Sequence, residues 1–446
     1  MRTLLNKTKP VVHRCVSCRK TFPHGFTTFC DRCNAMVDIE YDLDRATLHD
    51  SDNPLERFFD LLPLESSANL LPVEMQFTPC IHATKLGNYL GMPSLYLKDE
   101  TVLPTGTTKD RMAAVVLPFL WECGIREFCT SSTGNSSTAL ARLVTRYPEY
   151  RIYIFSGEDF KDRVHYADGE GVVHFVLRGA TFVEAFACAA AFASCHNLTS
   201  ERGFFNPSRR EGLKLAFLEA AEQVPQPIDW YVQAVSSAMG VYGAFKGARE
   251  LLALGRIPRL PRLLCVQQET CAPMARAFEE GSEVIRPEHV VEKPRGIADA
   301  ILRGNPEKVY PYVRRIVTES NGAFAAVSES EIREARSMVE ELEGLYPCFT
   351  SSAALAGMIR MVRKGALPHG DTVLVNLTGR DREPARSTQR VHWLKATDNG
   401  WEPEDPTDDA TRQLWSAPLA FQIPRGSKRG GHEGNKQRLL RKAPTQ

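Results

Sequence analysis

Residues 98–111 read KDETVLPTGTTKDR, and this segment joins a short apolar run to the start of a helical pattern. Pro104 and Gly106 bend the chain between the two, and Lys109 falls in the first turn of the expected helix. A lysine at a helix N-terminus meets the positive end of the helix dipole, which lowers its pKa and favours the neutral amine. A Schiff-base lysine requires that neutral amine. The alternative is an ordinary solvated lysine, since most lysines lie on the surface.

On either side of this segment, from about residue 90 to 390, short apolar runs alternate with amphipathic stretches. Strands are predicted at 94–97, 127–130, 151–155, 231–235, 263–266 and 372–377. Helices are predicted at 110–121, 136–145, 181–195, 212–223, 241–254 and 329–342. This alternation predicts an α/β fold with mostly parallel sheets covered by helices on both faces. Ligands of such sheets bind beyond the carboxyl ends of the strands, so the chemistry is expected in the loops there.

Two further loops between a predicted strand and a predicted helix carry anion-binding features. They are residues 131–137, SSTGNSS, and residues 236–240, SSAMG. Backbone N–H groups, hydroxyls and a helix N-terminus suit a carboxylate or a phosphate in both loops. The ordinary alternatives are a Ser/Thr N-cap in the first loop and a plain turn in the second. Each loop alone is ambiguous, whereas the three loops together indicate a ligand site.

Two C-x-x-C pairs lie near the N-terminus with 11 residues between them: Cys15, Cys18, Cys30 and Cys33. Two such turns facing each other form a tetrahedral four-thiolate site for Zn²⁺. All four positions act as ligands in this interpretation, so the zinc is structural and supplies most of the folding energy of its small surroundings. The alternatives are chance spacing, a redox pair, or a ligand role for His13 or His24.

Composition bounds the class of protein. The chain has 446 residues, of which 43% are hydrophobic and 24% charged, so global disorder is excluded. Fifty-five lysines and arginines against 54 acidic residues leave a formal charge of +1, so neither nucleic acid nor an anionic membrane is expected as a partner. No apolar run approaches the roughly 20 residues of a membrane span, and the N-terminus lacks the apolar core of a secretory signal. These features, with thiols expected to be reduced, predict a cytoplasmic protein.

The last part of the chain changes character. Acidic residues and prolines dominate residues 402–409, and residues 425–442 hold seven lysines and arginines against one glutamate. We expect residues 400–446 to form a disordered tail that is basic at its end. A solvated extension is favoured over a segment that contacts an anionic partner.

The loop motifs resemble those of the threonine synthase branch of the fold-type-II pyridoxal-phosphate enzymes, which are related to tryptophan synthase β chains and cysteine synthases. That branch typically reads K-D-E-x3-P-T-G-S-F-K-D-R, S-T-G-N-T-S and N-P-x-R-x-E-G-Q-K. This chain reads KDETVLPTGTTKDR at 98–111, STGNSS at 132–137 and NPSRREGLK at 206–214. Later matches are AILRGNP at 300–306, SAALAG at 352–357 and LTG at 377–379. The likeness runs from the four-cysteine ribbon to about residue 385.

The resemblance implies an organisation into two doubly wound subdomains behind a zinc ribbon. The ribbon is expected at residues 11–37. The larger subdomain, which binds pyridoxal phosphate, is expected to comprise residues 45–109 and 200–395, and the smaller one residues 110–199. Enzymes of this type are commonly dimers, so a homodimer is expected by resemblance.

The resemblance also implies a role for each loop. Lys109 is expected to form the internal aldimine with pyridoxal phosphate and to move the α-proton, and Asn135 to hydrogen-bond the phenolic oxygen of the cofactor. The substrate carboxylate is expected to bind Ser132, Thr133, Asn135 and Ser136. The cofactor phosphate is expected to bind Ser236, Ser237, Ala238, Met239 and Gly240. Thr378 is expected to face the pyridine nitrogen and leave it largely unprotonated, which suits elimination from a β or γ carbon better than transamination.

The sequence departs from the threonine synthase pattern around the substrate. Gly203 and Phe204 stand where that branch usually has Asn and Ser, which help to bind the substrate phosphate, while Arg209 remains as an anion clamp. The hypothesis is therefore β-elimination or β-replacement on an O-phospho or O-acetyl amino acid such as O-phosphoserine, as in cysteate synthase. The alternatives are a threonine synthase acting on O-phosphohomoserine and a non-catalytic protein that binds through its zinc ribbon.

Overall fold

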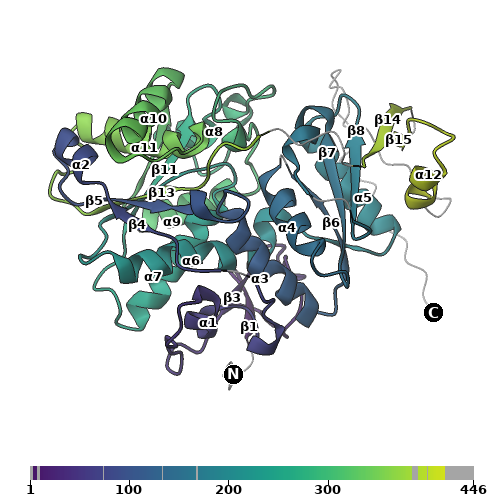
Figure 1. The fold of residues 1–446 in the computed structure, drawn as a ribbon, viewed down its shortest axis with the longest axis horizontal. Coiled ribbons are helices and arrows are strands. Elements are labelled where there is room, and N and C mark those ends of the chain that lie inside the picture. Colours follow the sequence, from purple (N-terminus) through teal and green to yellow (C-terminus); the bar gives the residue numbers. More distant parts are fainter. Residues whose placement is uncertain are drawn as a thin grey trace.

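Two six-stranded sheets dominate the computed structural model, which describes residues 4–7, 11–73, 75–132, 134–166, 169–383, 390–398 and 400–416 (Figure 1). All neighbouring strands run parallel except the pairs β4–β5 and β14–β15. Helices cover both faces of the larger sheet. The α/β fold class predicted from the alternating pattern is confirmed.

The larger sheet has the strand order β12-β11-β10-β13-β5-β4. Its strands are β4 (Cys80–His82), β5 (Leu95–Asp99), β10 (Trp230–Ala234), β11 (Arg262–Gln268), β12 (Ala323–Val327) and β13 (Val373–Leu377). Successive side chains alternate between two cores: Leu95 and Leu97 pack with the helices of one face, whereas Tyr96 packs with those of the other. Because both faces are buried, these strands appear in the sequence as continuous apolar runs.

The helices around the larger sheet form two layers. One layer contains α2 (Thr84–Leu90), α10 (Glu329–Glu343) and α11 (Phe349–Arg363). The other contains α3 (Lys109–Glu122), α6 (Pro207–Gln223), α7 (Met239–Ala253), α8 (Pro273–Glu279) and α9 (Tyr310–Glu319). Two glycines allow these helices to approach closely: a Cβ at Gly243 would lie 2.3 Å from the carbonyl oxygen of Arg210, and one at Gly212 would lie 2.6 Å from that of Arg111. Larger residues there would force α3, α6 and α7 apart.

The smaller sheet has the order β15-β14-β8-β7-β6-β9. Its strands are β6 (Glu127–Ser131), β7 (Arg151–Gly157), β8 (Val172–Leu177), β9 (Thr199–Ser200), β14 (His392–Thr397) and β15 (Gly400–Pro403). On one face, α3 and α4 (Asn135–Val144) pack against side chains such as Ile152 and Ile154. On the other face, α5 (Phe182–Cys195) covers Phe155 and Phe175. Helix α3 therefore shares one apolar core with both sheets (Figure 1).

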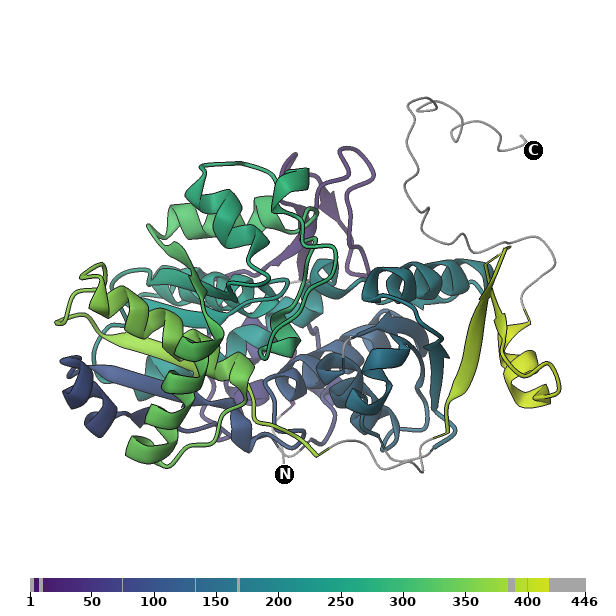
Figure 2. The same ribbon diagram turned by 90° about the horizontal axis from the view of Figure 1, so that it is seen from above.

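After β13 the chain crosses from the larger sheet to the smaller one, where β14 pairs with β8. Figure 2 shows β14 and β15 at the outer edge of that sheet. Residues 400–416, which the composition assigned to a disordered tail, include β15 and α12 (Asp409–Trp415), and Trp415 stacks on Phe192 with 5.5 Å between ring centroids. The remaining part of that expected tail, 417–446, lies outside the described residues.

The N-terminal residues form a small antiparallel sheet of β1 (Val12–Cys15), β2 (Thr21–Phe22) and β3 (Val37–Glu40), followed by the single turn α1 (Pro54–Arg57). This sheet is fixed to α6 and α9. The Arg210 side chain donates to the backbone oxygen of Val37 (3.1 Å) and to Asp38 (3.0 Å). The hydroxyl of Tyr312 accepts from the backbone N–H of Met36 at 3.0 Å. The cysteine-bearing segment thus packs on the larger sheet's helix layer.

Candidate active site

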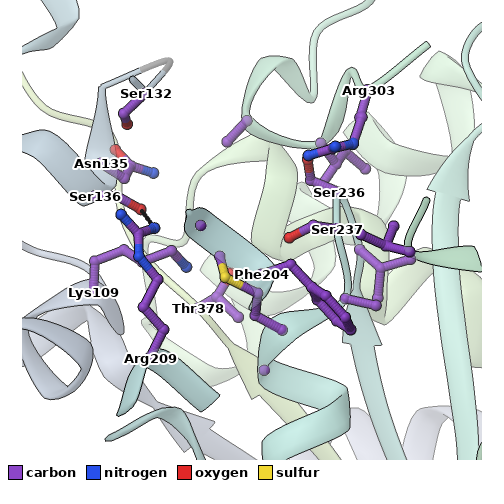
Figure 3. A pocket seen from close by; sticks show the side chains of 18 of the residues that line it. Lys109, Ser132, Asn135, Ser136, Phe204, Arg209, Ser236, Ser237, Arg303 and Thr378 are labelled. Carbon is purple, nitrogen blue, oxygen red and sulfur yellow. Dashed lines mark hydrogen bonds between the residues drawn. The ribbon is translucent and has the colours of Figure 1, made fainter. Parts of the chain in front are cut away.

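A cavity of about 220 Å³ lies between the two sheets, at the carboxyl ends of β6, β10 and β13 (Figure 3). All three loops that the sequence singled out contribute to its wall. The lining residues from those loops and from β13's end are Thr107, Lys109, Ser131, Ser132, Asn135, Ser136, Ser236, Ser237, Ala238, Met239, Gly240 and Thr378. The structure therefore brings together the predicted site residues that it describes. Thr133 lies outside the described residues.

The KDETVLPTGTTKDR segment owes its shape to a fully buried charge network. The Lys98 Nζ lies 2.8 Å from a carboxylate oxygen of Glu219, and the Arg111 Nε lies 2.6 Å from a carboxylate oxygen of Glu100. Arg111 also bridges the two carboxylates, since its guanidinium donates to Glu219 at 2.7 Å. Two cations thus meet two anions with no solvent exposure, a balance that a buried network needs. The network anchors both ends of the segment.

Between these anchors the loop turns back on itself so that Lys109 begins α3. The Asp110 carboxylate accepts from both the backbone N–H (2.6 Å) and the hydroxyl (2.9 Å) of Thr105. The N–H of Thr108 donates to the carbonyl oxygen of Thr378 at 2.9 Å. This bond holds the start of α3 against the end of β13, which places Lys109 and Thr378 at the same wall of the cavity.

The pKa of Lys109 is lowered from 10.5 to about 8. Burial is the largest cause, and the positive charge of Arg209 adds to it, whereas Glu100 opposes the shift. The direction agrees with the sequence-based expectation. Its main cause is removal of the amine from water, whereas the expectation rested on the helix terminus. A larger fraction of the amine is neutral near neutral pH than in an ordinary lysine.

The Thr378 side chain sits where β13 ends and α11 begins to cover it. Ser351 of α11 fixes this turn, because its hydroxyl donates to the carbonyl oxygen of Gly379 (2.7 Å) and accepts from the N–H of the same residue (2.9 Å). The hydroxyls of Ser351 and Thr378 lie 3.4 Å apart. A neutral hydroxyl, rather than a carboxylate, therefore faces the cavity from this strand.

The loop after β6 is arranged around Ser132. Its hydroxyl accepts from the backbone N–H groups of Gly134 (3.1 Å) and Ser137 (3.4 Å), which closes the loop over the start of α4. Asn135, the first residue of α4, accepts a hydrogen bond on its Oδ1 from Arg382. Because Oδ1 is occupied, the Asn135 amide presents its N–H₂ group as the free donor.

Arg209, expected as an anion clamp, lines the cavity but already has a carboxylate partner. Its guanidinium pairs with Glu201, and it also donates to the hydroxyls of Ser136 (3.1 Å) and Thr130 (3.3 Å). Both members of the pair are almost completely buried. Since Glu201 neutralises this arginine, a direct role of Arg209 toward an anionic substrate stays a prediction.

The loop after β10 offers donors suited to a phosphate. Ala238 adopts a left-handed conformation (φ 59°) and caps α7, whose first N–H groups have no partner within the helix. The hydroxyls of Ser236 and Ser237 point into the cavity in Figure 3. A Cβ at Gly240 would lie 2.5 Å from the side-chain nitrogen of Gln233, so a larger residue there would have to displace that side chain. Hydroxyls, backbone N–H groups and a helix dipole converge at this point.

Several cavity residues were not predicted from the sequence. Arg303 and Lys308 add positive charge, and Phe182 and Phe186 of α5 add an apolar wall. Phe204, already noted as a departure, is buried and packs its ring against Tyr242 with centroids 5.7 Å apart. Arg303 lies within the motif match at 300–306, which is the sequence signal that could have pointed to it.

The four N-terminal cysteines lie as a four-ligand site requires. Their sulfur atoms all lie within 4.8 Å of one another. Backbone N–H groups at both turns point at sulfur, as in the 3.4 Å contacts of Cys18 N with the Cys15 Sγ and of Arg32 N with the Cys30 Sγ. Such thiols can hold a metal ion such as zinc. The two nearby histidines lie elsewhere: His13 stacks on Phe119, and His24 lies 3.4 Å from the Glu122 carboxylate.

Comparison with known proteins identifies the family. A profile described as pyridoxal-phosphate dependent enzyme matches residues 73–379. The chain belongs to this family. Its relatives include a threonine synthase of Methanosarcina acetivorans, 29% identical over 376 residues, 82% of this chain and 90% of that protein. A cysteate synthase of Methanospirillum hungatei is 25% identical over 379 residues, 82% of this chain and 88% of that protein. The resemblance to the threonine synthase-like branch is confirmed.

Solved structures support the fold. Maize serine racemase superposes with a TM-score of 0.57 at 18% identity, covering 69% of this chain and 89% of that one. The processed threonine deaminase isoform 2 of Solanum lycopersicum gives a TM-score of 0.57 at 18% identity, covering 77% of this chain and 94% of that one.

Among the described residues, every helix is too short or too polar to cross a membrane.

The cavity fits the cofactor of this family. Pyridoxal phosphate offers an aldehyde for an amine, a phosphate for a donor-rich loop, and a ring with a phenolic oxygen and a pyridine nitrogen. Lys109 would hold the aldehyde, and the 236–240 loop the phosphate. The N–H₂ group of Asn135 and the hydroxyl of Thr378 would face the two polar atoms of the ring. Each of these groups lines the same cavity.

Proposed function

We propose that this protein eliminates or replaces the group on the β carbon of an O-activated amino acid such as O-phosphoserine, with Lys109 as the catalytic residue. The observation that carries the proposal is the pairing of a lysine of lowered pKa with a neutral hydroxyl, Thr378, at one wall of the cavity. When bound, pyridoxal phosphate withdraws electrons from the α carbon of the substrate. A hydroxyl partner for the ring nitrogen moderates this withdrawal, which favours loss of a leaving group.

The residues around Lys109 would divide the remaining work. The Lys109 amine takes the proton from the α carbon and returns a proton at the end of the reaction. Its pKa of about 8 keeps a useful fraction in each protonation state near neutral pH. The Ser132 and Ser136 hydroxyls and the N-terminus of α4 bind the substrate carboxylate, and Thr133 is assigned the same role. The Asn135 amide donates a hydrogen bond to the phenolic oxygen of the cofactor and so fixes the orientation of the ring.

The wall around Phe204 supports chemistry at the β carbon. An aromatic ring packed into the core gives no hydrogen bond to a distal phosphate, in contrast to the Asn and Ser that threonine synthases usually have here. Phe182 and Phe186 extend this apolar surface from α5. A serine derivative is one carbon shorter than O-phosphohomoserine, so its activating group would not reach as far toward the position of Phe204. The relatives named cysteate synthase are consistent with such a substrate.

The proposal is tested by offering the cofactor-loaded protein O-phosphoserine, O-acetylserine and O-phosphohomoserine in parallel. Sulfite and a small thiol are added as nucleophiles, and the released phosphate or acetate and the new amino acid are quantified. The proposal predicts release from a serine derivative and a β-substituted product that contains the nucleophile. Formation of threonine from O-phosphohomoserine, with no reaction of the serine derivatives, would instead establish the threonine synthase alternative.

We also propose that the four-cysteine site holds structural zinc, because all four thiols serve as ligands and leave no open position. Membership of an enzyme family disfavours the non-catalytic alternative. The homodimer, the cytoplasmic location and the subdomain boundaries 11–37, 45–109 with 200–395, and 110–199 stay predictions.

A further inference from the structure

Arg303 lies in the wall of the cavity, and no carboxylate of the described residues pairs with it. It follows the short helical turn Asp299–Ile301, and in Figure 3 its guanidinium points toward Ser236, across the cavity from Lys109. Within the described part of the chain, its Nε is sealed from solvent and has no hydrogen-bond partner. Burial lowers the pKa of Arg303 below its ordinary value, and no carboxylate in the described ranges offsets that effect. The residue as a whole is half-buried, but a sealed guanidinium nitrogen without a partner is costly unless a ligand supplies the acceptor.

Two carboxylates of this region already pair with other arginines. Asp299, four residues earlier in the chain, lies 3.2 Å from the guanidinium of Arg163. Glu201, on the other side of the cavity, pairs with Arg209. Arg163 and Arg209 are thus each neutralised by a carboxylate of the protein. Arg303 has no such carboxylate among the described residues.

The backbone that carries Arg303 is held in place from both sides. The side chain of Gln268 accepts from the N–H of Ala298 at 2.9 Å. The carbonyl oxygen of Gly304 accepts from the N–H of Val291 at 3.0 Å. Gly304 has no room for a side chain, since a Cβ would lie 1.8 Å from the Val291 carbonyl oxygen. The guanidinium is thus presented by a fixed loop, as preorganised recognition of an anion requires.

We propose that Arg303 binds the phosphate of pyridoxal phosphate together with Ser236, Ser237 and the N-terminus of α7. This inference rests on the proposed role of residues 236–240 as the phosphate loop. The loop itself contributes neutral hydroxyls and N–H groups, whereas a phosphate carries up to two negative charges, so a guanidinium supplies the missing charge. The position across from Lys109 favours the cofactor phosphate over the substrate carboxylate, which is assigned to Ser132 and Ser136 on the other side (Figure 3).

The test compares two probes on cofactor-free protein, pyridoxal phosphate and pyridoxal, which lacks the phosphate. Dissociation constants are measured from the near-visible absorption for the native protein, Arg303→Met and Arg303→Lys. We expect Arg303→Met to weaken pyridoxal phosphate binding about 10- to 100-fold, the range of a charge-assisted hydrogen bond, and to leave pyridoxal binding unchanged. Arg303→Lys restores part of the affinity because it keeps the charge without the planar fork.

Arg202 provides the matched control, since it also lines the cavity but is exposed to solvent. Arg202→Met is expected to change the pyridoxal phosphate affinity less than about 3-fold, because an exposed charge is screened. Should Arg303→Met fail to fold, Arg303→Lys is compared with the native protein on the same two probes, and we expect its loss of affinity to be confined to pyridoxal phosphate.

Equal loss of affinity for both probes in Arg303→Met, or none for either, overturns the proposal. Native cofactor affinity with a raised KM for an O-phospho amino acid also overturns it and assigns Arg303 to the substrate. These binding constants need no turnover, so a different reaction in the substrate panel would refute the proposed function and leave this inference standing.

Discussion

Replacing Lys109 by methionine should stabilise the cofactor-free protein. The amine pays a folding penalty because burial and Arg209 lower its pKa from 10.5 to about 8. That difference corresponds to up to about 3 kcal/mol against the charged amine in the fold. Methionine has a similar length and no charge, so Lys109→Met removes the penalty while it keeps most of the packing.

The pH dependence separates this cause from a general packing effect. The folded pKa lies below the unfolded one, so between about pH 8 and 10.5 the unfolded chain holds a proton that the folded protein has released. The native protein therefore gains stability as the pH rises through this window, and Lys109→Met does not share the gain. The advantage of the variant is largest below pH 8 and disappears above pH 10.5.

The assay is urea denaturation of both cofactor-free proteins at pH 7, 8.5 and 10, with the unfolding free energies compared at each pH. We expect Lys109→Met to be the more stable protein at pH 7 by up to about 3 kcal/mol, with a smaller difference at each higher pH. Equal or lower stability of the variant at pH 7 would refute the reasoning. So would an advantage that does not change with pH, because that result would assign the effect to packing.

Three further perturbations have definite outcomes. Cys30→Ser should reduce bound zinc from one ion per chain to a small fraction and lower the thermal midpoint, as measured by metal analysis and calorimetry. Glu219→Gln should cost about 3–5 kcal/mol in urea denaturation, because it leaves two buried cations with one carboxylate. Arg382→Met should weaken pyridoxal phosphate binding. It removes the hydrogen bond to the Oδ1 of Asn135, so the Asn135 amide is no longer held with its N–H₂ group toward the cofactor. The double variant with Asn135→Ala should then bind no more weakly than Asn135→Ala alone.

The first two of these perturbations have a matched control in the chain. Cys123→Ser alters a half-buried thiol outside the cluster and should keep the zinc. Glu334→Gln removes an exposed partner of Arg363 and should cost less than about 1 kcal/mol. Zinc retained by Cys30→Ser, a cost below 1 kcal/mol for Glu219→Gln, or additive losses for Arg382 and Asn135 would contradict the respective interpretations.

The central elements of the fold were predictable because their side chains are buried on both faces. The run predicted at 231–235 is β10 (Trp230–Ala234), and the run predicted at 372–377 is β13 (Val373–Leu377). The missed strands lack that signal: β8 has His174 in its middle, and β12 is mostly alanine. Helix α11 was missed because small and apolar residues occur all around it, so no period appears. β14 pairs with β8, which lies more than 200 residues earlier in the chain, and no local pattern indicates such a partner.

Some features of the candidate site were predictable from local sequence, and others were not. Lys109, Asn135 and the 236–240 loop follow from motifs that also determine the local backbone, so the sequence pointed to them. The pairing of Arg209 with Glu201 and the bond from Arg382 to Asn135 depend on contacts between distant elements. The proposed role of Arg303 could not be predicted from the sequence, because only the folded protein shows that no carboxylate of the described residues reaches this side chain.

The measurement that tests the central claim most directly is the location of the cofactor on the chain. The protein loaded with pyridoxal phosphate is reduced with borohydride, digested, and mapped by mass spectrometry. We predict that the phosphopyridoxyl group is found on Lys109, and that Lys109→Ala loses both the label and the near-visible absorption. A label on Lys308, the other lysine in the cavity wall, or no label at all would contradict the account.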